Sequence, residues 1–170
     1  MTDYKLLNET VQGYCGNEPA AIPLLSNISA VIYDELEDLN WAGFYLLRNK
    51  ETKAYVSVDF SLNEGDKDKY ELVVGPFQGK PACIIIPMNK GVCGTAAYQM
   101  NVQRVEDVHQ FPGHIACDSA SNSEIVIPLL KDGKVYGVLD IDSPILSRFS
   151  KEDETGLKEL CDYINQAIIL

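Results

Sequence analysis

The spacing of apolar residues predicts helices toward both ends of the chain. Between about residues 20 and 38, apolar side chains recur at intervals of three and four, as in a helix with one buried face. Residues 151–168 repeat this pattern, and Ser150 with Asp153 resembles a capping box at its start. Residues 1–15 predict a shorter, weakly patterned helix.

Apolar runs in the middle of the chain predict about six strands. In residues 53–60 every second side chain is apolar, which is typical of a half-buried strand. A short helix is expected at 95–100 and an exposed loop at 63–69. The other strand-like runs are 41–47, 71–75, 82–86, 102–105, 125–130 and 135–141. This order predicts an α+β fold with a mainly antiparallel sheet, terminal helices on one face and a loop-covered pocket on the other.

The segment Phe111–Glu124 interrupts the strands and is rich in Gly, Ser, Asn and Asp, which favour turns. A long loop inside a compact domain is usually functional or disordered. Because His114 and Cys117 lie within it, we favour a functional loop.

The turn between the last two strands decides whether three carboxylates meet. Asp140 and Asp142 are two positions apart and share one strand face. The Asp-Gly pair before them indicates a hairpin. A two-residue turn pairs Glu124 with Ile141, on the wrong face, whereas a three-residue loop pairs Glu124 with Asp142. Clustered acids raise one another's pKa and can act as general acids, so we favour the three-residue loop or a distortion at the strand's start. Solvated strand-end acids are the alternative interpretation.

Composition narrows the class of protein. The chain has 170 residues, enough for one domain with a sizeable core. Its net charge of -11 disfavours binding to nucleic acid or to an anionic membrane. The sequence contains neither a long apolar run nor the plan of a signal peptide, which predicts a cytoplasmic protein.

The five cysteines cannot all pair within one chain. Cys161 follows the apolar face of the last helix, so we expect it in the core, and Cys15 carries little functional weight. Cys93 lies between glycines before a predicted helix, whose N–H groups stabilise a thiolate. With Cys83 and Cys117, it suggests redox chemistry in a cytosolic chain. A zinc site could use these three cysteines with His109 and His114, but their spacing matches no common zinc module.

Cysteines, glycines and acids recur in several longer motifs. These motifs are Gly75–Cys83 (GPFQGKPAC), Gly91–Ala96 (GVCGTA), Val105–His109 (VEDVH), Gly113–Asp118 (GHIACD), Ser121–Glu124 (SNSE) and Gly137–Ser143 (GVLDIDS). Together they closely resemble those of the free methionine-(R)-sulfoxide reductases, which are single GAF-domain proteins. The resemblance covers nearly the whole chain, so we expect residues 1–170 to form one GAF domain.

The resemblance implies reduction of free L-methionine (R)-sulfoxide to methionine, protection against oxidative stress, regeneration by thioredoxin, and no cofactor or metal. It implies that Cys117 attacks the sulfoxide and that Cys83 then forms a disulfide with it. Cys93 can also take part in disulfide exchange. Which of Cys83 and Cys93 is the main resolving partner stays open.

The resemblance also implies that Glu124, Asp140 and Asp142 gather around the sulfoxide and the polar groups of the substrate. Phe60 is the candidate for an aromatic wall against the methyl group. In this chemistry a neutral carboxyl protonates the leaving oxygen, the sulfenic acid condenses with a second thiol, and an external dithiol opens the disulfide. For His114 we expect a hydrogen bond that stabilises its turn rather than catalysis.

Two other functions fit parts of the sequence. A GAF-type sensor module would bind a small molecule without turnover, and a metal-binding regulator would use the cysteines as ligands. A homodimer formed through the terminal helices is a further expectation.

Overall fold

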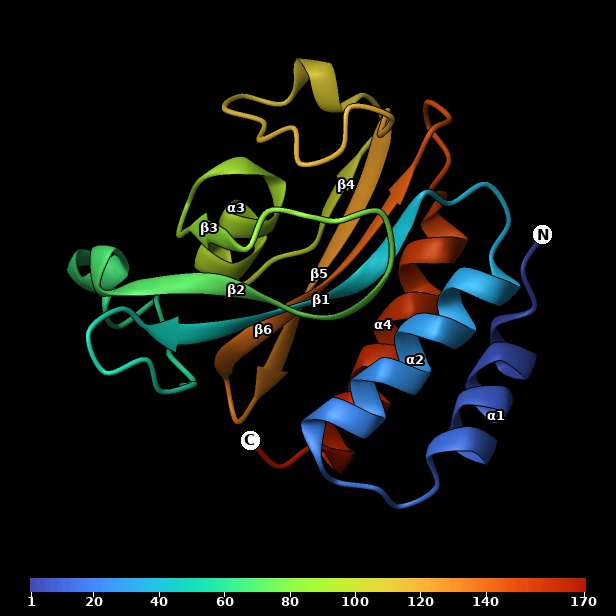
Figure 1. The fold of residues 1–170 in the computed structure, drawn as a ribbon, viewed down its shortest axis with the longest axis horizontal. Coiled ribbons are helices and arrows are strands. Elements are labelled where there is room, and N and C mark those ends of the chain that lie inside the picture. The colour runs from blue at the N-terminus through green and yellow to red at the C-terminus, as the bar shows by residue number, and fades with distance from the viewer.

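The computed structural model describes residues 1–170 and contains one six-stranded antiparallel sheet in the order β3-β2-β1-β6-β5-β4 (Figure 1). The strands are β1 (Trp41–Asn49), β2 (Tyr70–Gly79), β3 (Ile85–Pro87), β4 (Gln103–Val105), β5 (Ser123–Lys131) and β6 (Lys134–Ser143). The α-helices are α1 (Tyr4–Cys15), α2 (Ala21–Glu35), α3 (Gly91–Gln99) and α4 (Lys151–Ala167), and the 3-10 helices are η1 (Glu64–Lys69) and η2 (Val108–Gln110).

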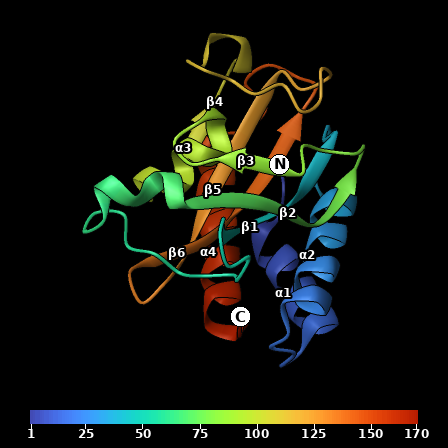
Figure 2. The same cartoon turned by 60° about the vertical axis from the view of Figure 1, so that its left-hand side comes forward.

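Helices cover the two sheet faces unequally, which confirms the predicted α+β layering. On one face α2 packs over β1 and β2, α4 packs over β5, and α1 packs outside α2 and α4 (Figures 1 and 2). The other face carries only the short helix α3 and the long loops. None of the helices is both long enough and apolar enough to span a membrane.

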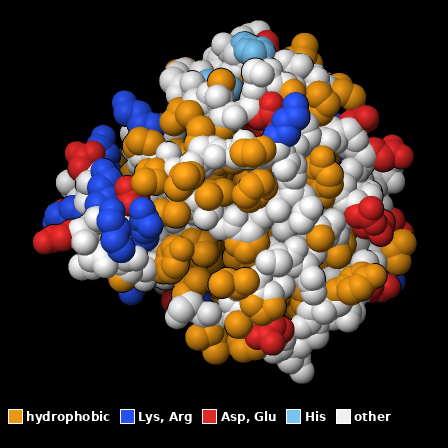
Figure 3. Space-filling model, viewed as in Figure 1, with side chains coloured by type: hydrophobic (Ala, Val, Ile, Leu, Met, Phe, Trp, Pro, Cys, Tyr) orange, Lys and Arg blue, Asp and Glu red, His pale blue; other side chains and the backbone are white.

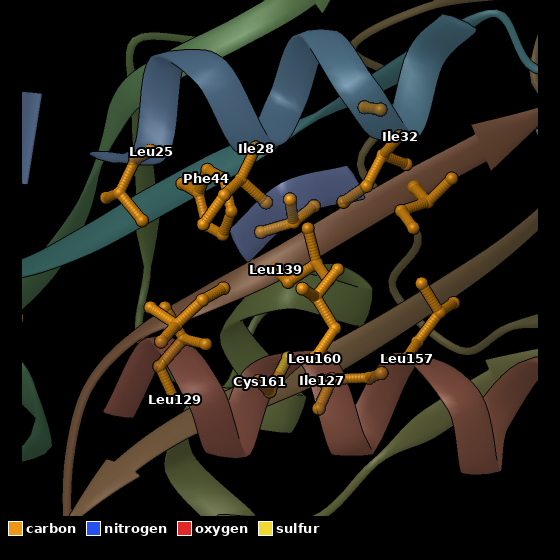
Figure 4. Close-up of a cluster of buried hydrophobic side chains, with 14 of the residues drawn as sticks. Leu25, Ile28, Ile32, Phe44, Ile127, Leu129, Leu139, Leu157, Leu160 and Cys161 are labelled. Atoms are coloured by element: carbon orange, nitrogen blue, oxygen red, sulfur yellow. The ribbon is translucent and has the colours of Figure 1, made fainter. Parts of the chain in front are cut away.

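The larger core lies between the sheet and the long helices (Figure 4). Ile28 of α2, Leu139 of β6 and Leu160 of α4 are fully buried there. Cys161 is 2% exposed in the same cluster, which confirms its expected role as a core residue. The α4 helix begins at the predicted capping box, in which Ser150 and Asp153 exchange side-chain-to-backbone hydrogen bonds.

The strand predicted at residues 53–60 is wrong. The segment makes only isolated bridges, from Tyr55 to Arg48 and from Val58 to Val135. Its alternation is nevertheless real, because Val58 and Phe60 are buried. The pairing of β1 with β6 ends at Leu46, so only Leu47–Asn49 remain free on that edge for hydrogen bonds to this segment, which is too short for a continuous ladder.

Several predicted boundaries also move. The run at 71–75 extends to a strand of ten residues, and the one at 82–86 shortens to β3, which leaves Cys83 in the preceding loop. The helix predicted at 95–100 begins at Gly91, so Cys93 lies inside its first turn rather than before it. The loop predicted at 63–69 contains η1.

The hairpin between β5 and β6 has a two-residue turn, so the three-residue loop is wrong. Lys131 pairs with Lys134, and both turn residues, Asp-Gly, have positive φ of 53° and 73°, as in a type I′ turn. A bulge then leaves Tyr136 unpaired and restores the parity. Glu124 consequently lies opposite Asp142, as the clustering of the acids required.

Candidate active site

A small cavity lies on the sheet face that the long helices leave free. Its floor is formed by β1, β5 and β6, and it is closed by α3, by the segment before β3 and by the lid loop, residues 111–122. The free volume is about 30 Å³, which is room for about two water molecules. The lining residues are Trp41, Tyr45, Pro81, Ala82, Ile86, Gly91, Val92, Cys93, His114, Ile115, Cys117, Asp118, Ser121, Glu124, Asp140 and Asp142.

The three predicted acids meet in this cavity. Glu124 and Asp140 are each 6% exposed, and Asp142 is half-buried. Glu124 and Asp142 are directly paired, so their side chains project from the same sheet face. Burial, followed by the charge of Asp140, raises the pKa of both Glu124 and Asp142 well above the ordinary values. Burial raises the pKa of Asp140 to about 6. The cluster therefore retains protons near neutral pH.

Cys93 lies inside the acid cluster. Its side chain is 4% exposed, and its Sγ is 3.9 Å from Glu124 Oε1. Burial and the charges of Asp140 and Glu124 raise the pKa of this thiol well above its usual range. The expected stabilisation of a thiolate by the helix N-terminus is therefore outweighed, because burial and two carboxylates act against one partial helix charge.

Cys83 and Cys117 form a disulfide, with Cα atoms 5.3 Å apart. Both residues are half-buried, and Cys117 lines the cavity. The Tyr45 hydroxyl donates a hydrogen bond of 2.9 Å to the main-chain oxygen of Cys83. The disulfide thus joins the segment before β3 to the lid loop at the edge of the cavity.

Asn40 holds the end of the lid loop. Its side-chain amide donates to Asp118 Oδ2 at 3.0 Å and to Ser121 Oγ at 2.9 Å. The N–H of Ala120 donates to the other Asp118 oxygen at 2.9 Å. These bonds fix the chain immediately after Cys117.

The two histidines, His109 of η2 and His114 of the lid loop, occupy different environments. His114 lines the cavity with its Nε2 3.9 Å from Glu124 Oε2, so its ring faces an acid instead of bonding within its own turn. Burial lowers the pKa of His114, which keeps the ring neutral. The ring of His109 instead forms a hydrogen bond of 3.0 Å with Asn122.

The structure does not bring Phe60 to the cavity. Its ring packs against Tyr70 and Tyr98, with centroids 5.7 and 5.5 Å away. The aromatic residues that line the cavity are Trp41 and Tyr45, whose stacked rings are 5.8 Å apart. The sequence contained a signal for both, because alternate residues of β1 share a face with Asp140 and Asp142 of the neighbouring strand.

Two buried polar atoms of the cavity have no hydrogen-bond partner: Trp41 Nε1 and Asp140 Oδ1. Such atoms are rare in folded proteins. A donor and an acceptor are thus both available to a polar ligand.

Charge elsewhere on the surface is distributed unevenly. Most Lys and Arg side chains on the face seen in Figure 3 gather at the end of the molecule formed by η1.

Comparison with known proteins identifies relatives over nearly the whole chain. A family model described as GAF domain matches residues 21–168. The free methionine-R-sulfoxide reductase of Escherichia coli (strain K12) is 46% identical over 165 residues, which cover 97% of this chain and 88% of that protein. A structure of fRMsr of Staphylococcus aureus in complex with substrate has a TM-score of 0.82 and 44% identity, and the match covers 98% of this chain and 96% of that chain. The structure of a free methionine-R-sulfoxide reductase from Neisseria meningitidis in complex with its substrate has a TM-score of 0.80 and 36% identity. The match covers 96% of this chain and 87% of that chain.

Proposed function

The chain belongs to the free methionine-R-sulfoxide reductase family of GAF-domain proteins, and we propose that it reduces free L-methionine (R)-sulfoxide by thiol chemistry centred on Cys117. It is an oxidoreductase that acts on a sulfoxide. The observation that supports this chemistry most directly is the convergence of Cys117, already bonded to Cys83, and three protonatable acids on one cavity.

In the first step the Cys117 thiolate attacks the sulfur of the sulfoxide. The sulfoxide oxygen is transferred to Cys117 as a sulfenic acid, and methionine leaves. The developing oxyanion needs a proton, which a neutral carboxyl can supply. Glu124 and Asp140 suit this role because burial keeps their pKa values raised.

In the second step the Cys83 thiol attacks the sulfenic sulfur, water leaves, and the disulfide forms. The Cys83–Cys117 bond of the structure supports Cys83 as the main resolving residue. Cys93 is buried within the acid cluster, so exchange through its thiol requires a rearrangement of the lid loop. A dithiol protein such as thioredoxin then reduces the disulfide by thiol–disulfide exchange.

The acids have a second use, since a free amino acid carries an ammonium group that they attract. Trp41 and Tyr45 replace Phe60 as the proposed wall for the methyl group, because they line the cavity. The free volume of about 30 Å³ is far below the several hundred Å³ of a ligand pocket. The substrate therefore enters the reduced form, after the Cys83–Cys117 bond opens and the lid loop moves.

A sensor module without turnover is the alternative function. It would use the same cavity but would not need Cys117. Cytoplasmic localisation and a homodimer remain predictions. Exposed Leu6, Tyr14 and Ile22 on α1 and α2 make these helices the first place to look for a dimer contact, by light scattering.

The decisive assay measures methionine formed from free methionine (R)-sulfoxide with thioredoxin, its reductase and NADPH. We expect turnover by the wild type and by Cys161→Ala, a matched control in the helix-side core. Cys117→Ser should fall to the background rate. A wild type that binds the sulfoxide without turnover would establish the sensor instead, and an active Cys117→Ser would move the attacking thiol elsewhere.

A further inference from the structure

Cys93, Glu124 and Asp140 form a compact set of potential metal ligands. The Cys93 sulfur and one carboxylate oxygen from each acid all lie within 4.8 Å of one another. The three residues are 4%, 6% and 6% exposed, so no bulk water separates them. They come from α3, β5 and β6, which explains why spacing along the chain does not reveal the set.

Asp140 Oδ1 provides a second and independent indication of a ligand. This oxygen is buried at the cavity and accepts no hydrogen bond. An unsatisfied buried acceptor is costly, and a cation is one species that would satisfy it. From these two observations we propose that the cavity binds a divalent zinc-class ion through Cys93, Glu124 and Asp140.

The donor types select the metal. A thiolate with carboxylates suits Zn²⁺, Co²⁺ or Cd²⁺, whereas Mg²⁺ and Ca²⁺ prefer oxygen ligands alone. Three protein ligands leave one tetrahedral position for water, and His114 Nε2, 3.9 Å from Glu124 Oε2, is a nearby nitrogen. On binding, the Cys93 thiol and any carboxyl of Glu124 or Asp140 that is still protonated lose their protons to solvent.

The disulfide form of the protein has both the room and the free thiol that the ion needs. The free volume of about 30 Å³ accommodates an ion with one water, since a water needs about 10–15 Å³. Cys83 and Cys117 are bonded to each other, whereas Cys93 is a free thiol. The disulfide form therefore keeps the site, and an ion there occupies the acids on which the proposed reduction depends. The site itself rests on geometry and not on that activity.

Co²⁺ titration of the untagged disulfide form, without reductant, tests the site directly. We expect one equivalent to produce a thiolate-to-cobalt charge-transfer band, which Zn²⁺ abolishes by displacement. Cys93→Ala should lose the band, and Asp140→Asn should weaken binding by at least about tenfold. Cys161→Ala should retain it, since Cys161 lies in the other core, away from the acids.

Absence of a thiolate–cobalt band in the folded wild type would overturn the proposal, and so would its persistence in Cys93→Ala. Cys93→Ser, with circular dichroism of each variant, separates loss of a ligand from loss of the fold. The readout needs no turnover. A protein that binds cobalt but reduces no sulfoxide refutes only the proposed function, and the reverse result refutes only the metal site.

Discussion

The Tyr45 hydroxyl donates a hydrogen bond to the main-chain oxygen of Cys83 across 38 positions of sequence. Tyr45 is 1% exposed and held in β1, so its position is fixed by the sheet. Cys83 lies in a loop, where the chain has no ladder hydrogen bonds to fix it. The bond therefore holds Cys83, which forms the disulfide with Cys117, in a fixed position relative to the sheet.

Tyr45→Phe should slow disulfide formation between Cys83 and Cys117. The variant keeps the ring and loses one buried hydrogen bond, which costs about 1 kcal/mol of unfolding free energy. The loop becomes less ordered, so the two sulfurs meet less often. Quenched thiol counting after oxidation of the reduced protein measures the rate.

Tyr136→Phe is the matched control. Its hydroxyl bonds Asn165 at 2.7 Å in the helix-side core. It should lose similar stability and keep the wild-type rate of disulfide formation. Equal slowing of both variants would mean that global stability, and not the Tyr45 bond, sets the rate.

The fold could be predicted where local chemistry determines it. The capping box of Ser150 and Asp153 predicts where α4 begins. The spacing of apolar residues in α2 predicts which face of that helix is buried. The strand predicted at residues 53–60 was wrong because alternating apolar side chains indicate which residues are buried and not whether the backbone pairs with another strand. Whether a strand forms depends on a free sheet edge, which is a property of the whole topology.

The site was predictable in its members but not in its register. The proposed chemistry favours a register in which Glu124 faces Asp142, but the Asp-Gly turn alone places them on opposite faces. The bulge at Tyr136 restores the pairing. It lies next to Gly137, where a Cβ would be 2.5 Å from the main-chain oxygen of Tyr45. That close approach involves a third strand and cannot be read from the hairpin.

Gly94→Ala should destabilise the protein by a few kcal/mol, as overpacking does. A Cβ at Gly94 would lie 2.3 Å from the Pro87 main-chain oxygen, so α3 must shift, and Cys93 with it. Urea unfolding measures the loss. Gly13→Ala, where a Cβ meets nothing within 4 Å, should instead stabilise α1 by about 0.5–1 kcal/mol. A neutral Gly94→Ala would contradict the close helix–strand contact.

Asn40→Asp should loosen the lid loop at neutral pH. The substitution sets a carboxylate against Asp118, where Asn40 now donates a hydrogen bond of 3.0 Å. Repulsion raises the pKa of both carboxyls in the folded state, so stability is lost as the pH rises through those values. Hydrogen exchange of residues 111–122 measures the loosening. Asn40→Ala removes the bond without adding charge. Because that bond helps to lower the pKa of Asp118, the loss from Asn40→Ala is full above the ordinary pKa of an aspartate and shrinks as the pH falls below it. Equal loosening by both variants at neutral pH would exclude repulsion.

Asp140→Asn should stabilise the protein above pH 6 while impairing its chemistry. Burial raises the Asp140 pKa from 3.8 to about 6, so the folded state binds this proton more tightly than the unfolded state. The contribution of the Asp140 carboxyl to the free energy of unfolding is therefore fully present below pH 4. It is lost as the pH rises from 4 to 6, which lowers the stability by about 3 kcal/mol for a pKa difference of about two. Asparagine mimics the protonated acid and escapes this loss.

In thermal melts from pH 4 to 8, the difference in melting temperature between Asp140→Asn and the wild type should grow from near zero to several degrees. The control Asp34→Asn, at an exposed position of α2, should stay within about 0.5 kcal/mol of the wild type at each pH. A variant that is less stable than the wild type at pH 8, or a difference constant with pH, would show that the folded protein does not raise the pKa of Asp140.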